Sequence, residues 1–192
     1  MLSAILLAAG ESKRMGEPKQ LMPLGSSTLL GQAIDNLLNA SVDETIVVVG
    51  HKAEEITKAI ATKPVKIMLN PNHRQGMSTS IIAGLILVDP KSQAVILALG
   101  DQPLVESQTI NQLIDEFHNH DKGIAVPTYQ GQRGHPIIFA IRYKPELMEL
   151  EGDIGGREIL QRHPEDVLEV TVDSASVITD INTQADYQSQ LG

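Results

Sequence analysis

Ser3-Ala4-Ile5-Leu6-Leu7-Ala8-Ala9-Gly10-Glu11-Ser12-Lys13-Arg14-Met15-Gly16-Glu17-Pro18-Lys19 is the stretch of the chain that is most informative about its fold. The apolar run Ser3–Ala8 has the length of a buried β-strand. Small and basic residues follow at once, as in a loop whose backbone N–H groups surround an anion. The stretch therefore predicts a first strand followed by a phosphate-binding loop, with a surface turn carrying solvated cations as the alternative.

Further aliphatic runs alternate with helical patterns along the first two-thirds of the chain. The expected strands are Thr45–Val49, Val65–Leu69 and Ala94–Leu99. Apolar residues recur at three- and four-residue steps in the expected helices, Leu29–Leu38, Glu54–Ile60, Ser80–Leu87 and around Ile110–Phe117. Such alternation predicts an α/β fold: a Rossmann-like, mostly parallel, twisted sheet with helices on both faces.

The last third of the chain has a different pattern. Strands are expected at Gly123–Thr128, Pro136–Ala140, Val167–Val172 and Val177–Asp180, with a Gly-rich loop at Tyr129–His135. Helical segments are expected near Glu146–Leu150, at Gly156–Arg162 and at the C-terminus. With no linker or repeat in view, we predict one domain over residues 1–192. We expect residues 1–120, which contain the predicted phosphate-binding loop, to be its NTP-binding half and residues 121–192 its acceptor-binding half.

Composition narrows the classes of function. The chain has 192 residues and a formal net charge of −9, which argues against nucleic acid as a partner. It has no Cys, which excludes disulfides and thiolate metal sites. The apolar run near Met1 is too short to span a bilayer and lacks the features of a signal peptide. We therefore expect a cytoplasmic protein that does not bind a membrane.

Two cations and two carboxylates stand where chemistry is expected. Arg14 can hold phosphate oxygens bidentately, and Lys19 offers a point charge for a transferring phosphate. Asp101 follows the strand Ala94–Leu99 and would face the same cleft; Mg²⁺ often takes one or two carboxylates plus substrate phosphates. Asp180 is the second candidate ligand. As alternatives, Asp101 caps the following helix, and Asp180 or Thr183 caps the terminal one.

The loop is neither G-x-x-x-x-G-K-[ST] nor G-x-G-x-x-G. Its pattern L-A-A-G-x-S-x-R-M-G-x-x-K resembles the signature of the MobA/MocA-like nucleotidyltransferases, which have a Rossmann-like fold of the nucleotide-diphospho-sugar transferase type. Further motifs of that family occur in the same order: N-P before G-M-S-x-S, L-G-D-Q-P, R-G-H-P, G-D-x-G-x-R and D-I-[DN]-T. The resemblance extends over nearly the whole chain, from Leu7 to Tyr187.

The resemblance assigns roles to individual residues. It implies catalytic roles for Arg14, Lys19 and Asp101, and Mg²⁺ ligation by Asp101 and Asp180. Asn182 stands where close relatives often have Asp. The implied nucleotide contacts come from residues around three loops, namely Leu7, Ala8, Ala9, Gly10, Arg14, Lys19, Asn70, Gly76, Ser78, Ser80 and Gly100. The implied acceptor contacts are Arg133, His135, Asp153 and Arg157.

Structural alternatives stand beside these roles. Ser78 and Ser80 are equally well explained as helix N-caps. An ion pair between Asp153 and Arg157 would fix a loop without binding substrate. His135 could be a structural histidine. His73 and Arg74 are expected to be solvated loop residues.

The resemblance implies transfer of CMP from CTP to the terminal phosphate of molybdopterin, with release of pyrophosphate. Guanylyl-transferring relatives tend to have L-A-G-G where this chain has Leu7-Ala8-Ala9-Gly10, and the extra methyl group of Ala9 would crowd a purine. The alternatives are a GTP-dependent molybdopterin enzyme and a sugar- or alditol-phosphate nucleotidyltransferase. A non-catalytic accessory protein that delivers cofactor to a molybdoenzyme is an alternative of a different class.

Overall fold

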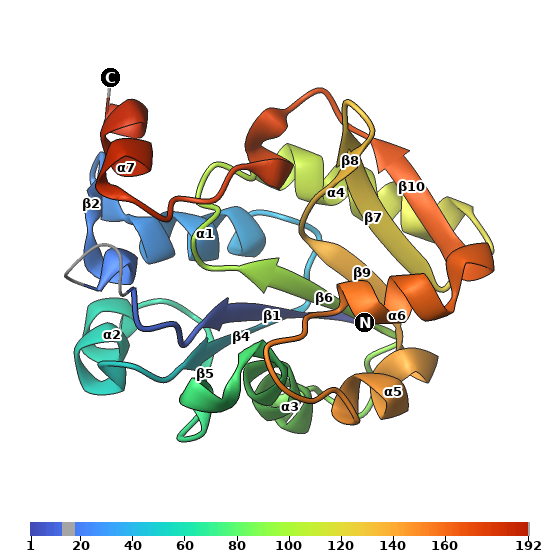
Figure 1. Ribbon diagram of the computed structural model, residues 1–192, viewed down its shortest axis with the longest axis horizontal. Helices are drawn as coiled ribbons and strands as arrows, with labels where there is room; N and C mark the ends of the chain where they lie inside the picture. Colours follow the sequence, from blue (N-terminus) through green and yellow to red (C-terminus); the bar gives the residue numbers. More distant parts are fainter. Residues whose placement is uncertain (13–17, 192) are drawn as a thin grey trace.

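An eight-stranded sheet runs through the protein in the computed structural model, which describes residues 1–12 and 18–191 (Figure 1). Its order is β10-β7-β9-β6-β1-β4-β5, with β8 paired to β7. The strands are β1 (Leu2–Ala8), β4 (Glu44–Val49), β5 (Lys66–Leu69), β6 (Ala94–Leu99), β7 (Ile124–Tyr129), β8 (Gln132–Arg133), β9 (Ile137–Ala140) and β10 (Val167–Thr171).

The strands β5, β4, β1 and β6 are all parallel to one another, as are β7 and β10. Only β8 and β9 pair antiparallel with their neighbours within this sheet of described residues. The prediction of a mostly parallel α/β sheet is therefore confirmed. Leu7 lies opposite Val48 on β4 and Leu99 on β6, so the three strands end at one edge of the sheet. The loops that follow these strands are brought together there.

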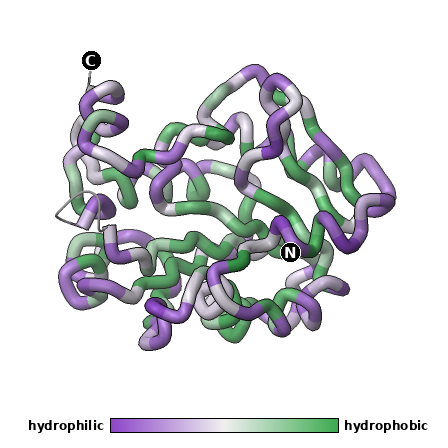
Figure 2. The backbone as a smooth tube through the Cα atoms, in the orientation of Figure 1, coloured by the Kyte–Doolittle hydropathy of each residue, from purple (hydrophilic) through white to green (hydrophobic). Residues whose placement is uncertain are grey.

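Helices cover both faces of the sheet, as Figure 1 shows. One face carries α1 (Leu29–Leu38), α2 (Ala53–Ile60) and α4 (Ser107–Asn119), and the other carries α3 (Met77–Leu87), α5 (Lys144–Met148) and α6 (Arg157–Arg162). Side chains of β1 alternate between the two layers: Ala4 and Leu6 pack toward α1, and Ile5 packs toward α3. The apolar colour of the central strands in Figure 2 reflects this burial on both faces.

The C-terminal segment returns to the N-terminal half. Helix α7 (Gln184–Leu191) packs beside the hairpin of β2 (Pro23–Leu24) and β3 (Ser27–Thr28). The Tyr187 hydroxyl donates to the Pro23 carbonyl at 2.6 Å, and Ile181 is fully buried in the same small apolar cluster. This packing brings residues near 180 to the loop that follows β1.

Two sequence predictions in the last third were wrong. Val177–Asp180 is not a strand: Ala175–Ile178 forms a 3₁₀ helix, η5, whose first turn is closed by the Ser174 hydroxyl accepting from the Ser176 N–H. Val177 is buried from this turn, so its apolar character reflects packing and not strand pairing. The expected loop 129–135 contains a hairpin, because Gln130 and Gly131 have φ values of 49° and 77° and reverse the chain into β8.

Other short 3₁₀ helices precede or follow the main elements: η1 (Lys19–Leu21), η2 (His73–Gln75), η3 (Ile141–Tyr143) and η4 (Pro164–Asp166). No helix among residues 1–12 and 18–191 is both long enough and apolar enough to cross a membrane.

Candidate active site

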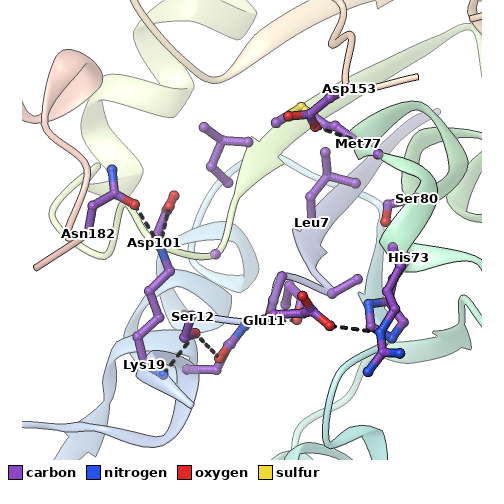
Figure 3. Close-up of a pocket in the computed structure, with 18 of the residues that line it drawn as sticks. Leu7, Glu11, Ser12, Lys19, His73, Met77, Ser80, Asp101, Asp153 and Asn182 are labelled. Atoms are coloured by element: carbon purple, nitrogen blue, oxygen red, sulfur yellow. Dashed lines mark hydrogen bonds and ion pairs between the residues drawn. The ribbon is translucent and has the colours of Figure 1, made fainter. Parts of the chain in front are cut away.

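A cleft of about 710 Å³ lies at the carboxyl ends of β1 and β6. Figure 3 shows Lys19, Asp101 and Asn182 on one side of it, His73 and Ser80 on the other, and Leu7 between them. The predicted site residues that line the cleft are Leu7, Ala8, Ala9, Gly10, Lys19, Gly76, Ser80, Gly100, Asp101, Asp153 and Asp180. Segments far apart in the sequence thus meet where the fold predicts a ligand site.

Lys19, Asp101 and Asn182 form one side of the cleft, called here the polar wall, and Lys19 contacts both of the others. Its Nζ is 2.7 Å from Oδ2 of Asp101 and 2.9 Å from Oδ1 of Asn182. The Lys19 backbone N–H donates to the Ser12 hydroxyl at 3.2 Å, which ties η1 to the loop after β1. The Lys19 and Asp101 side chains are only 14% and 21% exposed, so solvent screens their attraction less than at an open surface.

The side chain of Gln20 hydrogen-bonds to the backbone at the end of β1 and in the loop after it. Its side chain is buried, and Nε2 donates to the carbonyls of Ala8 at 3.2 Å and Gly10 at 3.1 Å. Both carbonyls are therefore occupied by a donor from the protein. Sequence reasoning did not assign Gln20 a role. In the sequence, Gln20 is distinguished only by its position next to Lys19, and its burial is seen only in the structure.

Two hydrogen bonds hold the segment that contains Asp101 against the segment that contains Asp180. The Ile181 N–H donates to the Asp101 carbonyl at 2.9 Å, and Nε2 of buried Gln102 donates to Oδ1 of Asp180 at 2.7 Å. Burial and the negative charge of Asp101 together raise the pKa of Asp180. Asp101 caps no helix, because α4 begins at Ser107. The cap of α7 includes the Thr183 hydroxyl, which accepts from the Asp186 N–H.

The two carboxylates fit a divalent cation that also uses ligand oxygens from a substrate. The negative charge of Asp101 contributes to the raised pKa of Asp180, and a cation placed between the two carboxylates would offset this repulsion. Within residues 1–12 and 18–191 no group of three or more His, Cys, Asp or Glu side chains forms a complete metal cage. Divalent cations such as Mg²⁺ are often bound through one or two carboxylates plus substrate phosphates, so Asp101 and Asp180 could hold such a cation together with oxygens of a substrate.

The opposite wall comes from the segment after β5. Asn70 is buried and its Nδ2 donates to Thr79 Oγ1 and Ser80 Oγ, both at 2.9 Å, so Asn70 braces α3 and does not line the cleft. Ser78 is buried as well and donates to the Gly152 carbonyl at 2.7 Å. Neither serine is an N-cap, because α3 begins one residue before Ser78, at Met77, with Gly76 in the cap position.

Helix α3 is capped by a distant loop. Oδ1 of Asp153 accepts from the Met77 N–H at 3.1 Å, and the Gly152 carbonyl accepts from the Ser78 N–H at 3.3 Å. Asp153 therefore neutralises the positive end of α3 and forms no ion pair with Arg157; both residues are in the described part of the chain. The segment around Asp153 is held at the cleft by this contact.

His73 is part of the cleft wall, which corrects the expectation of a solvated loop residue. Its ring lies against Gly50 and is half-buried, and its Nδ1 is buried without a hydrogen-bond partner. An unfilled lone pair is less costly than an unpaired N–H, so the arrangement favours the tautomer protonated at Nε2. Arg74 is 77% exposed, as expected for a solvated residue, although its Nε lies 2.8 Å from Glu11 Oε1 and it also lines the cleft.

Three of the four predicted acceptor residues lie outside the main cleft. Arg133 is on β8 and forms an ion pair with Glu169 at 2.7 Å. Arg157 and Asp153 line a neighbouring open hollow of about 590 Å³, so Asp153 is common to both cavities. Burial and the charge of Arg157 lower the pKa of half-buried His135 to about 4, which keeps it neutral near pH 7. Arg14, the other predicted phosphate-binding cation, lies outside the described residues.

Comparison with known proteins agrees with this geometry. The model of the MobA-like NTP transferase domain matches residues 4–167. The chain is 30% identical to nicotine blue oxidoreductase of Paenarthrobacter nicotinovorans, over 85% of this chain and 83% of that protein. It is 28% identical to the molybdenum cofactor cytidylyltransferase of Escherichia coli, over 97% of this chain and 93% of that protein.

The structure of Rv0371c from Mycobacterium tuberculosis superposes with a TM-score of 0.90 at 32% identity, covering 99% of this chain and 96% of that one. A structure of the same protein in complex with manganese gives a TM-score of 0.85. The matched domain extends from β1 to the start of β10 and includes Lys19 and Asp101. This protein is therefore a member of the MobA-like NTP transferase family and an enzyme of the nucleotidyltransferase type.

Proposed function

We propose that this protein transfers CMP from CTP to the terminal phosphate of molybdopterin, with Mg²⁺ as cofactor and pyrophosphate as the second product. The observation that carries the proposal is the convergence of Lys19, Asp101 and Asp180 on one cleft beside the backbone loop Ala8–Gly10. A relative named molybdenum cofactor cytidylyltransferase, aligned over 97% of the chain, supports this choice of substrates. Because CTP is a cytoplasmic metabolite, the proposal also places the protein in the cytoplasm.

The reaction is an in-line displacement at phosphorus. An oxygen of the acceptor phosphate attacks the α-phosphorus of CTP, a new P–O bond forms, and the bond to the bridging oxygen of pyrophosphate breaks. Both substrates are anionic, so the protein has mainly to orient them and offset charge. Lys19 supplies a cation beside the phosphates, and Arg14 is proposed to hold their oxygens. Mg²⁺ held by Asp101 and Asp180 would supply further charge neutralisation, and no protein nucleophile is needed.

We assign the acceptor to the hollow next to the cleft. Arg157 lines this hollow and is the cation that we propose for an anionic substrate, whereas Arg162 in the same lining is paired with Glu158. Asp153, shared by both cavities, marks where the two substrates would approach each other. His135 would be available as a neutral hydrogen-bonding group, since its pKa is lowered to about 4 by burial and by Arg157. Arg133, engaged by Glu169, is proposed to bind the acceptor only if that ion pair opens.

The relative named nicotine blue oxidoreductase points to a different chemistry, an oxidation or reduction. Reduction needs an electron donor, and the loop after β1 lacks the G-x-G-x-x-G pattern of dinucleotide binding. Two interacting carboxylates next to a lysine are the groups that phosphoryl chemistry requires. A GTP-dependent transferase, a sugar-phosphate transferase and a cofactor-delivery protein for a molybdoenzyme share the same groups and are separated by experiment.

The test is pyrophosphate release from each of the four NTPs with Mg²⁺ and molybdopterin, with product mass measured in parallel. Release with CTP and a cytidylylated product would support the proposal. Release with GTP alone would overturn the choice of nucleotide, and no release with any NTP would remove the enzymatic assignment. Oxidation of a reduced nicotinamide in the presence of nicotine blue would favour the reductase alternative.

Asp101→Asn should abolish turnover while leaving the fold intact. The matched control is Asp35→Asn, because Asp35 forms a comparable 2.6 Å ion pair with Lys63 away from the cleft. An active Asp101→Asn variant would exclude Asp101 as the principal metal ligand.

A further inference from the structure

The ammonium group of Lys19 contacts one carboxylate oxygen of Asp101, and both residues line the cleft. Nζ donates to Asp101 Oδ2 at 2.7 Å and to Asn182 Oδ1 at 2.9 Å. Figure 3 shows the three side chains directed toward one another on the polar wall. Asp180 also faces this wall, and the charge of Lys19 acts on it. Lys19 thus forms an ion pair with Asp101, and its charge acts on Asp180; these are the two carboxylates that a divalent cation would use.

Asn182 presents its side-chain oxygen to Lys19 at 2.9 Å. A lysine ammonium only donates hydrogen bonds, so the Asn182 side chain must present its oxygen to it. The backbone of Asn182 is fixed as well, because its N–H and that of Thr183 donate to Asp186 Oδ2 at 3.0 and 2.7 Å. The neutral amide therefore marks a docking point for Lys19 next to Asp101.

A fixed ammonium and a divalent cation repel each other when both lie next to one carboxylate. The effect is considerable here because Lys19 and Asp101 are mostly shielded from solvent. Nucleotide phosphates carry more negative charge than the single Asp101 carboxylate and offer Lys19 a competing partner. The position of Lys19 therefore links the two ligands, since whatever moves it toward phosphate relieves its repulsion of the metal.

We propose that Lys19, docked on Asp101 and positioned by Asn182, blocks the divalent-cation site until nucleotide phosphates draw it away. The cation then enters with the nucleotide and not before it. The inference rests on the proposed function only in taking Asp101 and Asp180 as the metal site. It is independent of which NTP is used and of the acceptor.

The test is titration of the nucleotide-free protein with Mn²⁺, with free Mn²⁺ measured by electron paramagnetic resonance. Lys19→Met should bind Mn²⁺ at least about tenfold more tightly than wild type, because it lacks the competing charge. Lys63→Met is the matched control: it removes a lysine paired with Asp35 at 2.6 Å outside the cleft and should leave Mn²⁺ affinity unchanged. Unchanged or weaker binding by Lys19→Met would overturn the proposal.

Asn182→Ala provides a second, independent test, with an opposite expectation for the two possible roles. If Asn182 positions Lys19, its removal loosens the lysine and Mn²⁺ binds about threefold or more tightly. If Asn182 were a metal ligand, Mn²⁺ would bind more weakly and the proposal would fail. Asp101→Asn should remove the tight binding gained in Lys19→Met; retention of that binding would place the metal elsewhere and also overturn the proposal. Pyrophosphate release is not involved, so failure of the proposed reaction would be seen separately.

Discussion

The buried side-chain amide of Gln102, in the loop after β6, donates to Oδ1 of Asp180 at 2.7 Å. The same Nε2 also donates to the Val177 carbonyl at 3.3 Å. One amide thereby joins the loop after β6 to a segment nearly eighty residues later. Because Gln102 directly follows Asp101 in the chain, this hydrogen bond sets where the Asp180 carboxylate lies relative to Asp101.

Gln102→Leu should lower kcat/KM for nucleotide transfer about tenfold or more, because Asp180 loses the donor that orients it. Leaving the Val177 carbonyl and Asp180 without this partner should also cost about 1–3 kcal/mol of the free energy of unfolding. Steady-state kinetics and urea denaturation measure the two effects separately. Gln32→Leu is the control, because Gln32 donates to Asn36 on α1, outside the cleft. Wild-type kinetics in Gln102→Leu would show that Asp180 needs no such support.

Gly76→Ala should destabilise the protein by about 3 kcal/mol or more. Gly76 has a φ of +116°, and a Cβ there would lie 2.3 Å from the Gly152 carbonyl group, which is backbone and cannot move aside cheaply. Gly131→Ala is a matched control with φ of +77° and nothing within 4 Å, so it should cost only about 1 kcal/mol. Equal losses in urea denaturation would contradict the close approach of the two backbones.

Asp166, which does not line the cleft, should make a contribution to the free energy of unfolding that is lost in acid. Burial alone would raise the pKa of Asp166, but donors from Tyr143, Arg142 and the Gly123 N–H lower it to about 2. The ionised form is thus favoured by folding, so its contribution is full above about pH 4 and is lost as the pH falls toward 2. Burial and Asp166 likewise raise the pKa of Tyr143 to about 12.

Asp166→Asn should therefore reduce the free energy of unfolding by about 1–3 kcal/mol at pH 7, where the carboxylate holds charge-assisted hydrogen bonds. The difference from wild type should shrink between pH 4 and pH 2. Urea denaturation followed by circular dichroism at pH 7, 5 and 3 measures it. A difference that stays constant over this range would show that the charge of Asp166 is not what stabilises the fold.

Ala9→Gly should shift nucleotide preference from CTP toward GTP. The Ala9 methyl group and the His73 ring both pack next to Gly50, where a Cβ on residue 50 would lie 2.9 and 2.7 Å from them. Removing the methyl group frees space on the His73 side of the cleft, and a change of one carbon is worth about tenfold or more in selectivity. The ratio of kcat/KM for CTP to that for GTP measures the effect.

Ala8→Gly is the control for this prediction. Its methyl group lies in the other core layer, near Gly100, and should affect stability more than selectivity. An unchanged CTP-to-GTP ratio in Ala9→Gly would remove the methyl group as the basis of nucleotide choice.

Local sequence patterns determined the βα half of the fold. Helix α1 spans Leu29–Leu38, as its apolar spacing predicts, and the four aliphatic runs became β1, β4, β5 and β6 with bounds shifted by one residue at most. The patterns of β1, β4 and β6 are reliable because inner parallel strands are buried on both faces and are therefore mostly aliphatic, whereas the edge strand β5 includes exposed Lys66. The position of Asp101 after β6 follows from the same logic.

Only the tertiary structure decided which polar residues share the cleft. The predicted strand Val177–Asp180 instead begins in the 3₁₀ helix η5, where the Val177 carbonyl accepts from the His135 N–H at 2.8 Å and from Gln102 Nε2 at 3.3 Å. The sequence predicts ligand contacts for Asn70 and Ser78 and assigns no role to Gln102. In the structure all three are buried and hydrogen-bond to other protein groups. Sequence determined the loop after β1 and the cation Lys19; contacts across more than eighty residues decided that Lys19 rests on Asp101 and Asn182, because only folding sets such distances.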